Sequence, residues 1–269
     1  EKFKDLAKLG DIDYDRFIRT TDPDHYDAVN HFWKVVYDKG YIYQGEHSGW
    51  YSISDEAFYT EMDIEEVIDE KSNNKIMVSK ETGSEVVHQS EVNYFFKLSL
   101  FQSQLLNHIK ANPGFVKPEK YYDYIVNELE VNKLPDLSIS RPSWRLQWGI
   151  PVPNDDTQRI YVWFDALVNY LTSIGYPNIK EMPQMTHLVG KDIIKFHCIH
   201  WPTFLMAAGI QLPKEVVVHG HWLMGGRKMS KSRGNVADPI EISNYYGSDA
   251  LRLFMMKYSV LDTDGDYTE

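Results

Sequence analysis

In the carboxyl-terminal part of the chain, apolar strands alternate with amphipathic helices. The segments "RIYVWFDALVNYLTSIG" from Arg159 and "THLVGKDIIKFHCIHWPTFLMAAG" from Thr186 each have the pattern of an apolar strand followed by a helix. The segment "EVVVHGHWLM" from Glu215 is a third continuous apolar strand. Such alternation is typical of a parallel sheet covered on both faces. We therefore predict that residues 155–245 form half of a doubly wound α/β domain.

The preceding residues show a different pattern. Residues 21–40 have helical spacing, with an Asp-Pro pair at the start and a glycine at the end. Residues 40–60 are rich in aromatic and β-branched residues broken by glycines, which predicts short antiparallel strands. Residues 91–110 and 118–132 have helical patterns. We expect a mixed α+β region inserted before the parallel sheet.

Four conspicuous polar or glycine positions fall where the predicted strands end: Asp165, Gly190, Asp192 and His219. In open α/β sheets, ligands bind outside the carboxyl ends of the strands. Asp192 is also placed to cap a helix, and this role is compatible with a ligand at the same helix terminus. The sequence therefore predicts a ligand site at this edge of the sheet.

A cationic loop follows the last of these strands. Arg227, Lys228, Lys231 and Arg233 lie within seven residues, with no acid between them and two glycines before them, although the net charge of the chain is −11. Lysines on a glycine-led loop can move onto a polyphosphate and neutralise charge that develops there. The alternative is a solvated surface loop, but the position of this loop at the predicted ligand edge favours phosphate binding.

The residues Lys228 to Ser232, "KMSKS", resemble the second signature of class I aminoacyl-tRNA synthetases. The segments "THLVGKDIIKFHCIHWP", "YVWFDALVNY", "EVNYFFKLS" and "SISRPSWRLQWGIP" resemble the methionyl members of that class. The resemblance implies ATP-dependent activation of methionine to methionyl-adenylate and its transfer to tRNA(Met). It implies, as the fold, the second half of a Rossmann-like (HUP-type) parallel sheet with an inserted connective-peptide domain.

The same resemblance divides the chain into four parts. Residues 1–19 would be the end of the first half of the sheet, and residues 20–154 the inserted connective-peptide domain on the acceptor-end side of the tRNA. Residues 155–234 would be the second half of the sheet with the KMSKS loop. Residues 235–269 would begin the helical region that contacts the tRNA stem.

Roles for individual residues follow from their positions in these motifs. Lys228 and Lys231 would be the catalytic cations. The residues expected to face ATP or the adenylate are Gly190, Asp192, His219, Trp222, Ser230 and Ser232. The residues expected to line the methionine pocket are Trp163, Ala166, Tyr170, Phe196, His197 and Trp201. A cage of polarizable aromatic groups suits a thioether, although any one aromatic residue at this spacing would ordinarily be a core residue.

The expected small-molecule partner besides methionine is ATP with Mg²⁺, and no structural zinc is expected. Many methionyl enzymes hold zinc with two CxxC pairs, and the matching positions here are Ser52, Asp55, Ser79 and Thr82. Hydroxyls cannot replace thiolates in such a site, and Cys198 is the only cysteine. The residues expected to hold these turns instead are Trp50, Tyr51, Phe58 and Tyr59. An insert without zinc resembles those of organellar and some bacterial members. The expected location is the mitochondrial matrix or, failing that, the cytoplasm.

The expected partners are methionine, ATP and tRNA(Met). A membrane is not expected, because the sequence has no apolar run long enough to span one, and DNA is not expected, because the net charge is acidic. The first class I signature, HIGH, does not occur in the sequence. We therefore expect an internal piece of a longer enzyme, lacking the anticodon-binding domain and having little or no activity alone.

Three alternatives to a methionyl enzyme fit the sequence less well. Another class I synthetase with an editing domain would need a longer insertion than residues 20–155. A non-catalytic nucleotide- or RNA-binding module derived from a synthetase is disfavoured by the intact Lys228 and Lys231. An unrelated α/β domain with a chance basic loop is disfavoured by four further motif segments in the right order.

Overall fold

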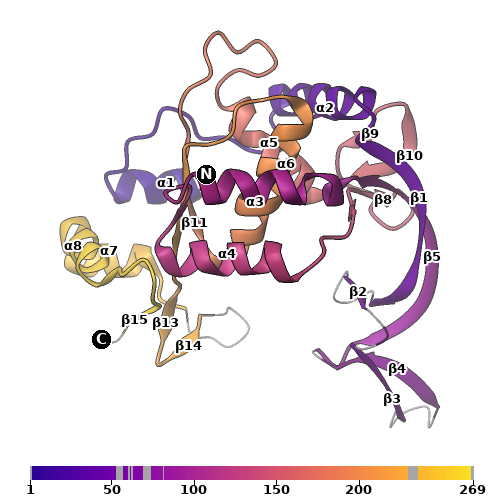
Figure 1. Cartoon of the computed structure of the whole chain (residues 1–269). Helices are drawn as coiled ribbons and strands as arrows, with labels where there is room; N and C mark the ends of the chain where they lie inside the picture. The colour runs from indigo at the N-terminus through magenta and orange to yellow at the C-terminus, as the bar shows by residue number, and fades with distance from the viewer. Residues whose placement is uncertain are drawn as a thin grey trace. The chain divides into compact units, whose positions relative to one another are not determined.

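The chain folds into two units, which are described separately (Figure 1). The first unit comprises Glu1–Tyr41, Lys97–Asp136 and Val162–Glu269, and the second comprises Ile42–Phe96 and Leu137–Tyr161. The computed structural model describes residues 2–52, 57–59, 61, 63–68, 74–80, 82–229 and 236–267.

The first unit contains a parallel sheet in the strand order β11-β12-β6. Strands β11 (Thr186–Gly190) and β12 (Glu215–His219) pair in parallel along their whole length, and β6 (Val116–Lys117) pairs with the other edge of β12. Gly190 and His219 are register partners at the carboxyl ends of their strands. The two apolar segments predicted as parallel strands therefore bring these two residues together.

The composition of this sheet differs from the prediction in two respects. The segment from Arg159 does not supply a parallel strand, because β10 (Asp155–Ile160) pairs antiparallel with strands of the second unit. The third parallel strand is β6, whose residues the sequence pattern assigned to the insert. Along β11 only alternate residues are buried in the part of the chain that the structure describes, since Leu188 is 68% exposed. The expectation of a strand covered on both faces is wrong there.

Helices supply most of the core of the first unit. The bounds of the helices are α1 Lys2–Leu9, α2 Pro23–Asp38, α3 Gln102–Ala111, α4 Glu119–Val131, α5 Val162–Thr172, α6 Trp201–Ala208, α7 Pro239–Tyr246 and α8 Ser248–Tyr258, with 3₁₀ turns at Leu98–Phe101 and Lys191–Ile193 and a π-helical turn at Phe196–His200. Phe32 and Trp33 of α2 contact the ring of Phe164 on α5 at centroid distances of 5.7 and 5.3 Å. These contacts bury α5 against α2.

A small sheet in the order β14-β13-β15 follows the parallel sheet in sequence. It contains β13 (Trp222–Met224), β14 (Arg227–Lys228) and β15 (Gly265–Tyr267). Gly225 and Gly226 connect β13 to β14 with φ angles of 59° and 70°, and tight hairpin turns of this hand require such angles. This glycine pair allows the chain to turn sharply just before the cationic residues.

The second unit consists of antiparallel strands. A six-stranded sheet has the order β2-β1-β5-β4-β3, with β7 paired to β5, and a smaller sheet has the order β8-β10-β9. The remaining bounds are β1 Ile42–Ser52, β2 Ala57–Tyr59, β3 Ile64–Ile68, β4 Lys75–Ser79, β5 Glu85–Phe96, β7 Leu137–Ser138, β8 Ser140–Pro142 and β9 Pro151–Val152. The long neighbouring arrows of β1 and β5 are prominent in Figure 1. The prediction of antiparallel strands over residues 40–60 is confirmed for the described residues.

The helix predicted over residues 91–110 is wrong in its first part. Residues 91–96 belong to β5 and pair with β1, with Ile42 opposite Phe96, while the helix α3 begins at Gln102. Aromatic residues at consecutive positions fit both periodicities, and the long partner strand β1 decides in favour of the sheet. The helix predicted at residues 118–132 is confirmed as α4.

The boundaries between the two units differ from the predicted domain boundaries. Residues 20–41 and 97–136, expected in the insert, lie in the first unit. The assignment of residues 20–154 as a connective-peptide domain stays a prediction.

Candidate active site

One face of α5 forms an aromatic wall with the π-helical turn. Trp163, Ala166 and Tyr170 are spaced three and four residues apart and therefore share a face of the helix, and each is half-buried. The Trp163 ring stacks on Phe196 with a centroid distance of 3.7 Å and an interplanar angle of 8°. The Tyr170 ring meets His197 edge-on at 5.6 Å. The structure thus brings together five of the six residues predicted to line a methionine pocket.

Hydrogen bonds fix the tautomer of His197. Its Nδ1 lies 2.9 Å from the carbonyl oxygen of Ile193, which can only accept, so Nδ1 carries the hydrogen. Nε2 then accepts from the Tyr170 hydroxyl at 2.6 Å. Burial lowers the pKa of His197 and raises the pKa of Tyr170 to about 12. Both side chains are therefore neutral at physiological pH.

Trp201, the sixth predicted pocket residue, contacts the Tyr170 ring at a centroid distance of 6.0 Å. It is fully buried, and its Nε1–H donates to Nε2 of His187 at 3.2 Å. His187 also packs against Tyr170 with a ring-centroid distance of 4.2 Å. Burial, followed by the proximity of His197, lowers the pKa of His187 to about 4. His187 was not predicted as a site residue, although a polar residue within an apolar strand was a usable signal.

The polar end of the site is built where β11 and β12 end. A Cβ added to Gly190 would lie 2.8 Å from Oδ1 of Asp192, so only glycine admits the aspartate this close to the strand. His221 Nε2 lies 3.3 Å from the same carboxylate oxygen. Burial acts to raise the pKa of Asp192, but the hydrogen bond and charge of His221, a backbone hydrogen bond and the charge of Lys228 together outweigh burial, and the pKa is lowered. Asp192 is thus an ionised acceptor beside the strand ends.

His219 and Trp222 contribute to this end in different ways. His219 is exposed, and its Nδ1 donates to the carbonyl oxygen of Gly220 at 2.7 Å, which fixes Nε2 as the acceptor of the neutral ring. The Trp222 ring packs against Phe254 at a centroid distance of 5.4 Å, and a Cβ on Gly265 would lie 3.1 Å from it. The Trp222 side chain is therefore used in packing.

The hairpin that leads into the cationic loop is held by two aspartates. The Asp266 carboxylate accepts from the Gly226 N–H at 3.1 and 3.2 Å, and Asp264 accepts from the backbone N–H of His221 at 2.8 Å. Lys191 pairs with Asp264 at 2.7 Å. These aspartates were not predicted as site residues, although the acidic run "DTDGDY" marked them.

The described part of the cationic loop ends just beyond Lys228. Lys228 lies on β14 opposite Leu223 and is exposed. Ser230, Lys231 and Ser232, to which the sequence assigned phosphate contacts, lie outside the described residues.

Asp165 does not take the position that the strand pattern predicted for it. It lies in the first turn of α5, 7% exposed, and its Oδ1 is 2.5 Å from Nε2 of His25. The expectation that Asp165 faces the ligand edge is wrong, because the segment before it is not a strand of the parallel sheet.

The turns that match the zinc knuckle contain hydroxyl contacts where they are described. Ser79 is buried, and its Oγ accepts from the backbone N–H of Thr82 at 3.3 Å. Trp50 donates to Glu61 at 2.9 Å. Asp55 and the Phe58 side chain lie outside the described residues. The described residues contain no group of three or more His, Cys, Asp or Glu placed to hold a metal ion.

Parallel strands with Gly190 and His219 at their carboxyl ends, followed by a glycine-led cationic hairpin, define an α/β protein of the nucleotide-binding type. None of the helices that the structure describes could cross a membrane. A family model described as "tRNA synthetases class I (M)" matches residues 1–269, and the chain belongs to this family.

Curated relatives of the chain carry the same family's names. The mitochondrial methionine–tRNA ligase of Candida albicans is 56% identical over 281 residues, which cover 100% of this chain and 48% of that protein. The enzyme of Saccharomyces cerevisiae is 50% identical, with 100% and 51% covered, and that of Homo sapiens is 45% identical, with 99% and 45% covered. The chain thus spans about half the length of the curated relatives it matches. Their mitochondrial names support the expected mitochondrial location.

A solved structure confirms the fold. The crystal structure of Mycobacterium tuberculosis methionyl-tRNA synthetase bound by methionyl-adenylate matches with a TM-score of 0.86 and 39% identity, over 99% of this chain and 52% of that chain. The α/β fold of a class I synthetase, predicted from the sequence, is therefore confirmed, with the differences in the strands noted above.

Proposed function

We propose that the protein containing this chain is a methionine–tRNA ligase, which activates methionine with ATP and transfers it to tRNA(Met). The observation that carries the proposal is the aromatic wall of Trp163, Tyr170 and Phe196 beside a strand edge with an ionised Asp192 in a chain of this family. The methionine–tRNA ligase names of the relatives and the methionyl-adenylate in the M. tuberculosis structure support the same activity.

Methionine recognition rests on neutral, polarizable surfaces. A thioether is a weak hydrogen-bond acceptor and gains most from close contact with aromatic rings. The stacked Trp163–Phe196 pair offers ring surface, and the Tyr170 hydroxyl is already bonded to His197. Ala166, on the same face of α5, leaves room for an unbranched side chain. A charged or strongly polar amino-acid side chain would be desolvated here without a charged partner.

The adenylate would lie along the polar end. Asp192 is an ionised acceptor suited to the ribose hydroxyls, and Gly190 leaves space for the sugar to approach the strand. His219 and the backbone near Trp222 would contact the adenine. This placement orients the α-phosphate of ATP toward the aromatic wall, where the methionine carboxylate can reach it.

In the first reaction step, an oxygen of the methionine carboxylate attacks the α-phosphorus of ATP, and pyrophosphate leaves with the electron pair of the broken P–O bond. Lys228 and Lys231, with the hydroxyls of Ser230 and Ser232, neutralise the charge that develops on the departing phosphates. Mg²⁺ bound with ATP would add positive charge to these phosphates. In the second step, the terminal ribose hydroxyl of tRNA(Met) attacks the activated carbonyl and AMP leaves.

The remaining parts of the chain receive supporting roles. Residues 20–154 would form the connective peptide beside the tRNA acceptor end, residues 235–269 would begin the stem-contact region, and the turns at Ser52 and Ser79 would fold without zinc. The protein would be located in the mitochondrial matrix. Because the HIGH signature is absent from residues 1–269, this chain alone should support little or no adenylation.

The test is aminoacylation by the full-length protein that carries this sequence. With ATP and mitochondrial tRNA(Met), it should charge the tRNA with methionine and with neither leucine nor valine. The isolated residues 1–269 serve as the second arm and should give little or no methionine-dependent ATP–pyrophosphate exchange. Charging with leucine at a comparable rate, or no charging at all, would refute the proposed ligase.

A further inference from the structure

Helix α5 presents two opposite faces, and only one of them carries the proposed pocket. Trp163, Ala166 and Tyr170 share the half-buried face. Asp165 and Thr172, two turns apart, share the opposite face, and both are buried. Any rotation of α5 about its axis would therefore move both sets of side chains together.

A single histidine of α2 bridges the two turns on the back of α5. His25 is fully buried, with Nε2 2.5 Å from Oδ1 of Asp165 and Nδ1 2.9 Å from Oγ1 of Thr172. Both ring nitrogens have a partner. The Thr172 hydroxyl in turn donates a hydrogen bond to the carbonyl oxygen of Val168 at 3.2 Å. One rotation and one axial position of α5 satisfy these contacts simultaneously.

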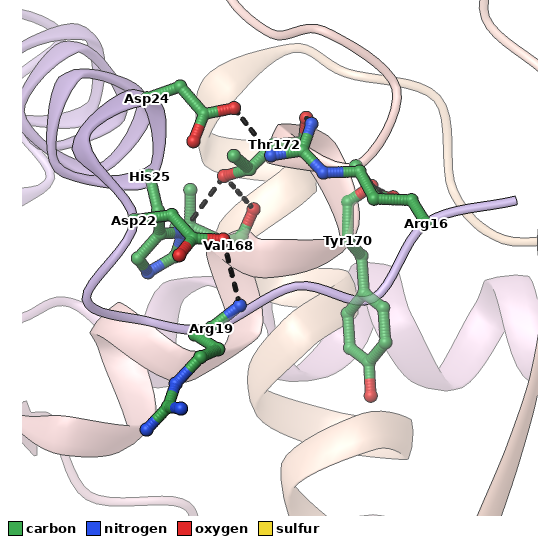
Figure 2. A network of polar contacts seen from close by, with 9 residues as sticks. Arg16, Arg19, Asp22, Asp24, His25, Val168, Tyr170 and Thr172 are labelled. Atoms are coloured by element: carbon green, nitrogen blue, oxygen red, sulfur yellow. Dashed lines mark hydrogen bonds and ion pairs between the residues drawn. The ribbon is translucent and has the colours of Figure 1, made fainter. Parts of the chain in front are cut away.

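The end of the same helix is held by Arg16. Its guanidinium donates to the carbonyl oxygen of Thr172 at 3.0 Å and pairs with Asp24, the neighbour of His25, at 2.5 Å. The hydrogen bond from Arg16 lowers the pKa of Asp24. The carbonyl groups in the last turn of a helix lack partners within the helix, and Arg16 supplies one. Figure 2 shows these contacts around Thr172, with the Tyr170 ring directed away from them.

We propose that His25 is a positioning residue for amino-acid binding: by bridging Asp165 and Thr172 it sets the rotation of α5 and thereby the pocket face. This inference rests on the proposed function. His25 belongs to the opposite side of α5 and acts on Trp163 and Tyr170 through the helix. Without His25, the carboxylate of Asp165 would be buried without its partner, and such a group draws in water or moves the element that carries it.

The geometry predicts a selective effect. The Trp163–Phe196 stack, at 3.7 Å between centroids, joins α5 to a separate turn, so a small rotation of α5 opens it. The polar end lies at the carboxyl ends of β11 and β12, whereas the contact of α5 with β11, between Tyr170 and His187, lies near the amino end of that strand. Loss of the bridge should therefore raise the KM for methionine and leave the KM for ATP nearly unchanged.

The test uses His25→Phe and His25→Gln in the full-length protein, with initial rates of ATP–pyrophosphate exchange. H25F should raise the KM for methionine about tenfold or more, the effect of losing a buried hydrogen-bonded partner, while the KM for ATP stays within about twofold. H25Q places an amide donor near Asp165 and should recover most of the methionine affinity. His31→Gln is the matched control, because His31 also lies on α2 and bonds a hydroxyl, that of Tyr176 at 2.8 Å, but is exposed.

Thr172→Val is the second variant, since it removes only the hydroxyl contact and leaves the pair with Asp165 intact. It should raise the KM for methionine severalfold with the KM for ATP unchanged, and it keeps the test decisive if H25F does not fold. Unchanged methionine KM values in folded H25F or T172V, or equal rises for methionine and ATP, would overturn the positioning role. A wild-type protein without methionine-dependent exchange would instead overturn the proposed function.

Discussion

The two ends of the proposed site handle charge in opposite ways. At the aromatic end, the half-buried Tyr170 and the buried His197 are bonded to each other and neutral. At the polar end, Asp192 is half exposed and ionised, and Lys228 is exposed on a hairpin. The first end can select a side chain by shape and polarizability, because its groups are locked by packing. The second can follow a substrate whose charge is redistributed during reaction, because its groups are solvated and adjustable.

The largest effect is expected for the cationic loop. Lys231→Ala should slow adenylation about a hundredfold to a thousandfold, the usual cost of losing a group that stabilises transition-state charge, with little change in methionine binding. ATP–pyrophosphate exchange gives the rate, and tryptophan fluorescence titration with methionine gives the affinity. Lys214→Ala, at the other end of β12, is the control and should behave as wild type. Equal losses in rate and in methionine affinity would contradict the transition-state role.

The next effect is expected at the aromatic wall. Trp163→Ala removes the ring stacked on Phe196 and should raise the KM for methionine about tenfold to a hundredfold, corresponding to about 1.5–3 kcal/mol for the apolar contact of a large side chain. The KM for ATP should change less than about twofold. Exchange kinetics with each substrate varied in turn provide both constants. A larger change in the KM for ATP than in the KM for methionine would contradict the assignment of methionine to the aromatic end and ATP to the polar end.

A smaller effect, on the KM for ATP and not on the KM for methionine, is expected from Gly190→Ala. The φ of Gly190 is −71°, so alanine fits the backbone, but its Cβ would lie 2.8 Å from Oδ1 of Asp192 and displace that carboxylate. The KM for ATP should rise about tenfold, by loss of a charge-assisted hydrogen bond, and that for methionine should not. Gly114→Ala is the matched control, since its Cβ would meet only Lys117 at 3.9 Å. An unchanged KM for ATP in G190A would contradict the assignment of Asp192 to the adenylate site.

The smallest effect concerns pH and stability. The pKa of His187 is about 4 in the folded protein and near 6.5 when unfolded, so the unfolded state binds more protons between these values. The neutral ring therefore stabilises the fold above pH 6.5, and this contribution falls as the pH drops toward 4. His187→Gln should show a shallower loss of unfolding free energy over this range than wild type. Urea denaturation at several pH values measures both slopes, and identical slopes would contradict the assignment.

Local patterns were sufficient for some elements and not for others. The strands at 186–190 and 215–219 are continuous apolar runs with helices after them, so their type and their common ligand edge could be predicted. The motif at Lys228 likewise identified the family without any tertiary information. Where the partner was distant, prediction failed: Asp165 is paired with His25, 140 positions away, and no local pattern indicates that contact.

The site shows the same division. The family motif assigned Trp163, Ala166 and Tyr170 to one pocket, and the structure places them on one face of α5. The sequence marked His187 only as a polar residue within an apolar strand, and its hydrogen bond to Trp201 on a different element could not be predicted. Residues 91–96 were predicted to be helical from their spacing, but they form a strand because they pair with β1. Short-range periodicity predicts faces, whereas tertiary partners decide which faces are used.

The most direct test of the division between the two ends is a crystal structure of the full-length protein with a non-hydrolysable methionyl-adenylate analogue. The account predicts the thioether against Trp163 and Tyr170, the ribose hydroxyls on Asp192, and the adenine beside His219. An analogue bound with its adenine on the aromatic wall, or with its methionyl side chain at Asp192, would contradict it.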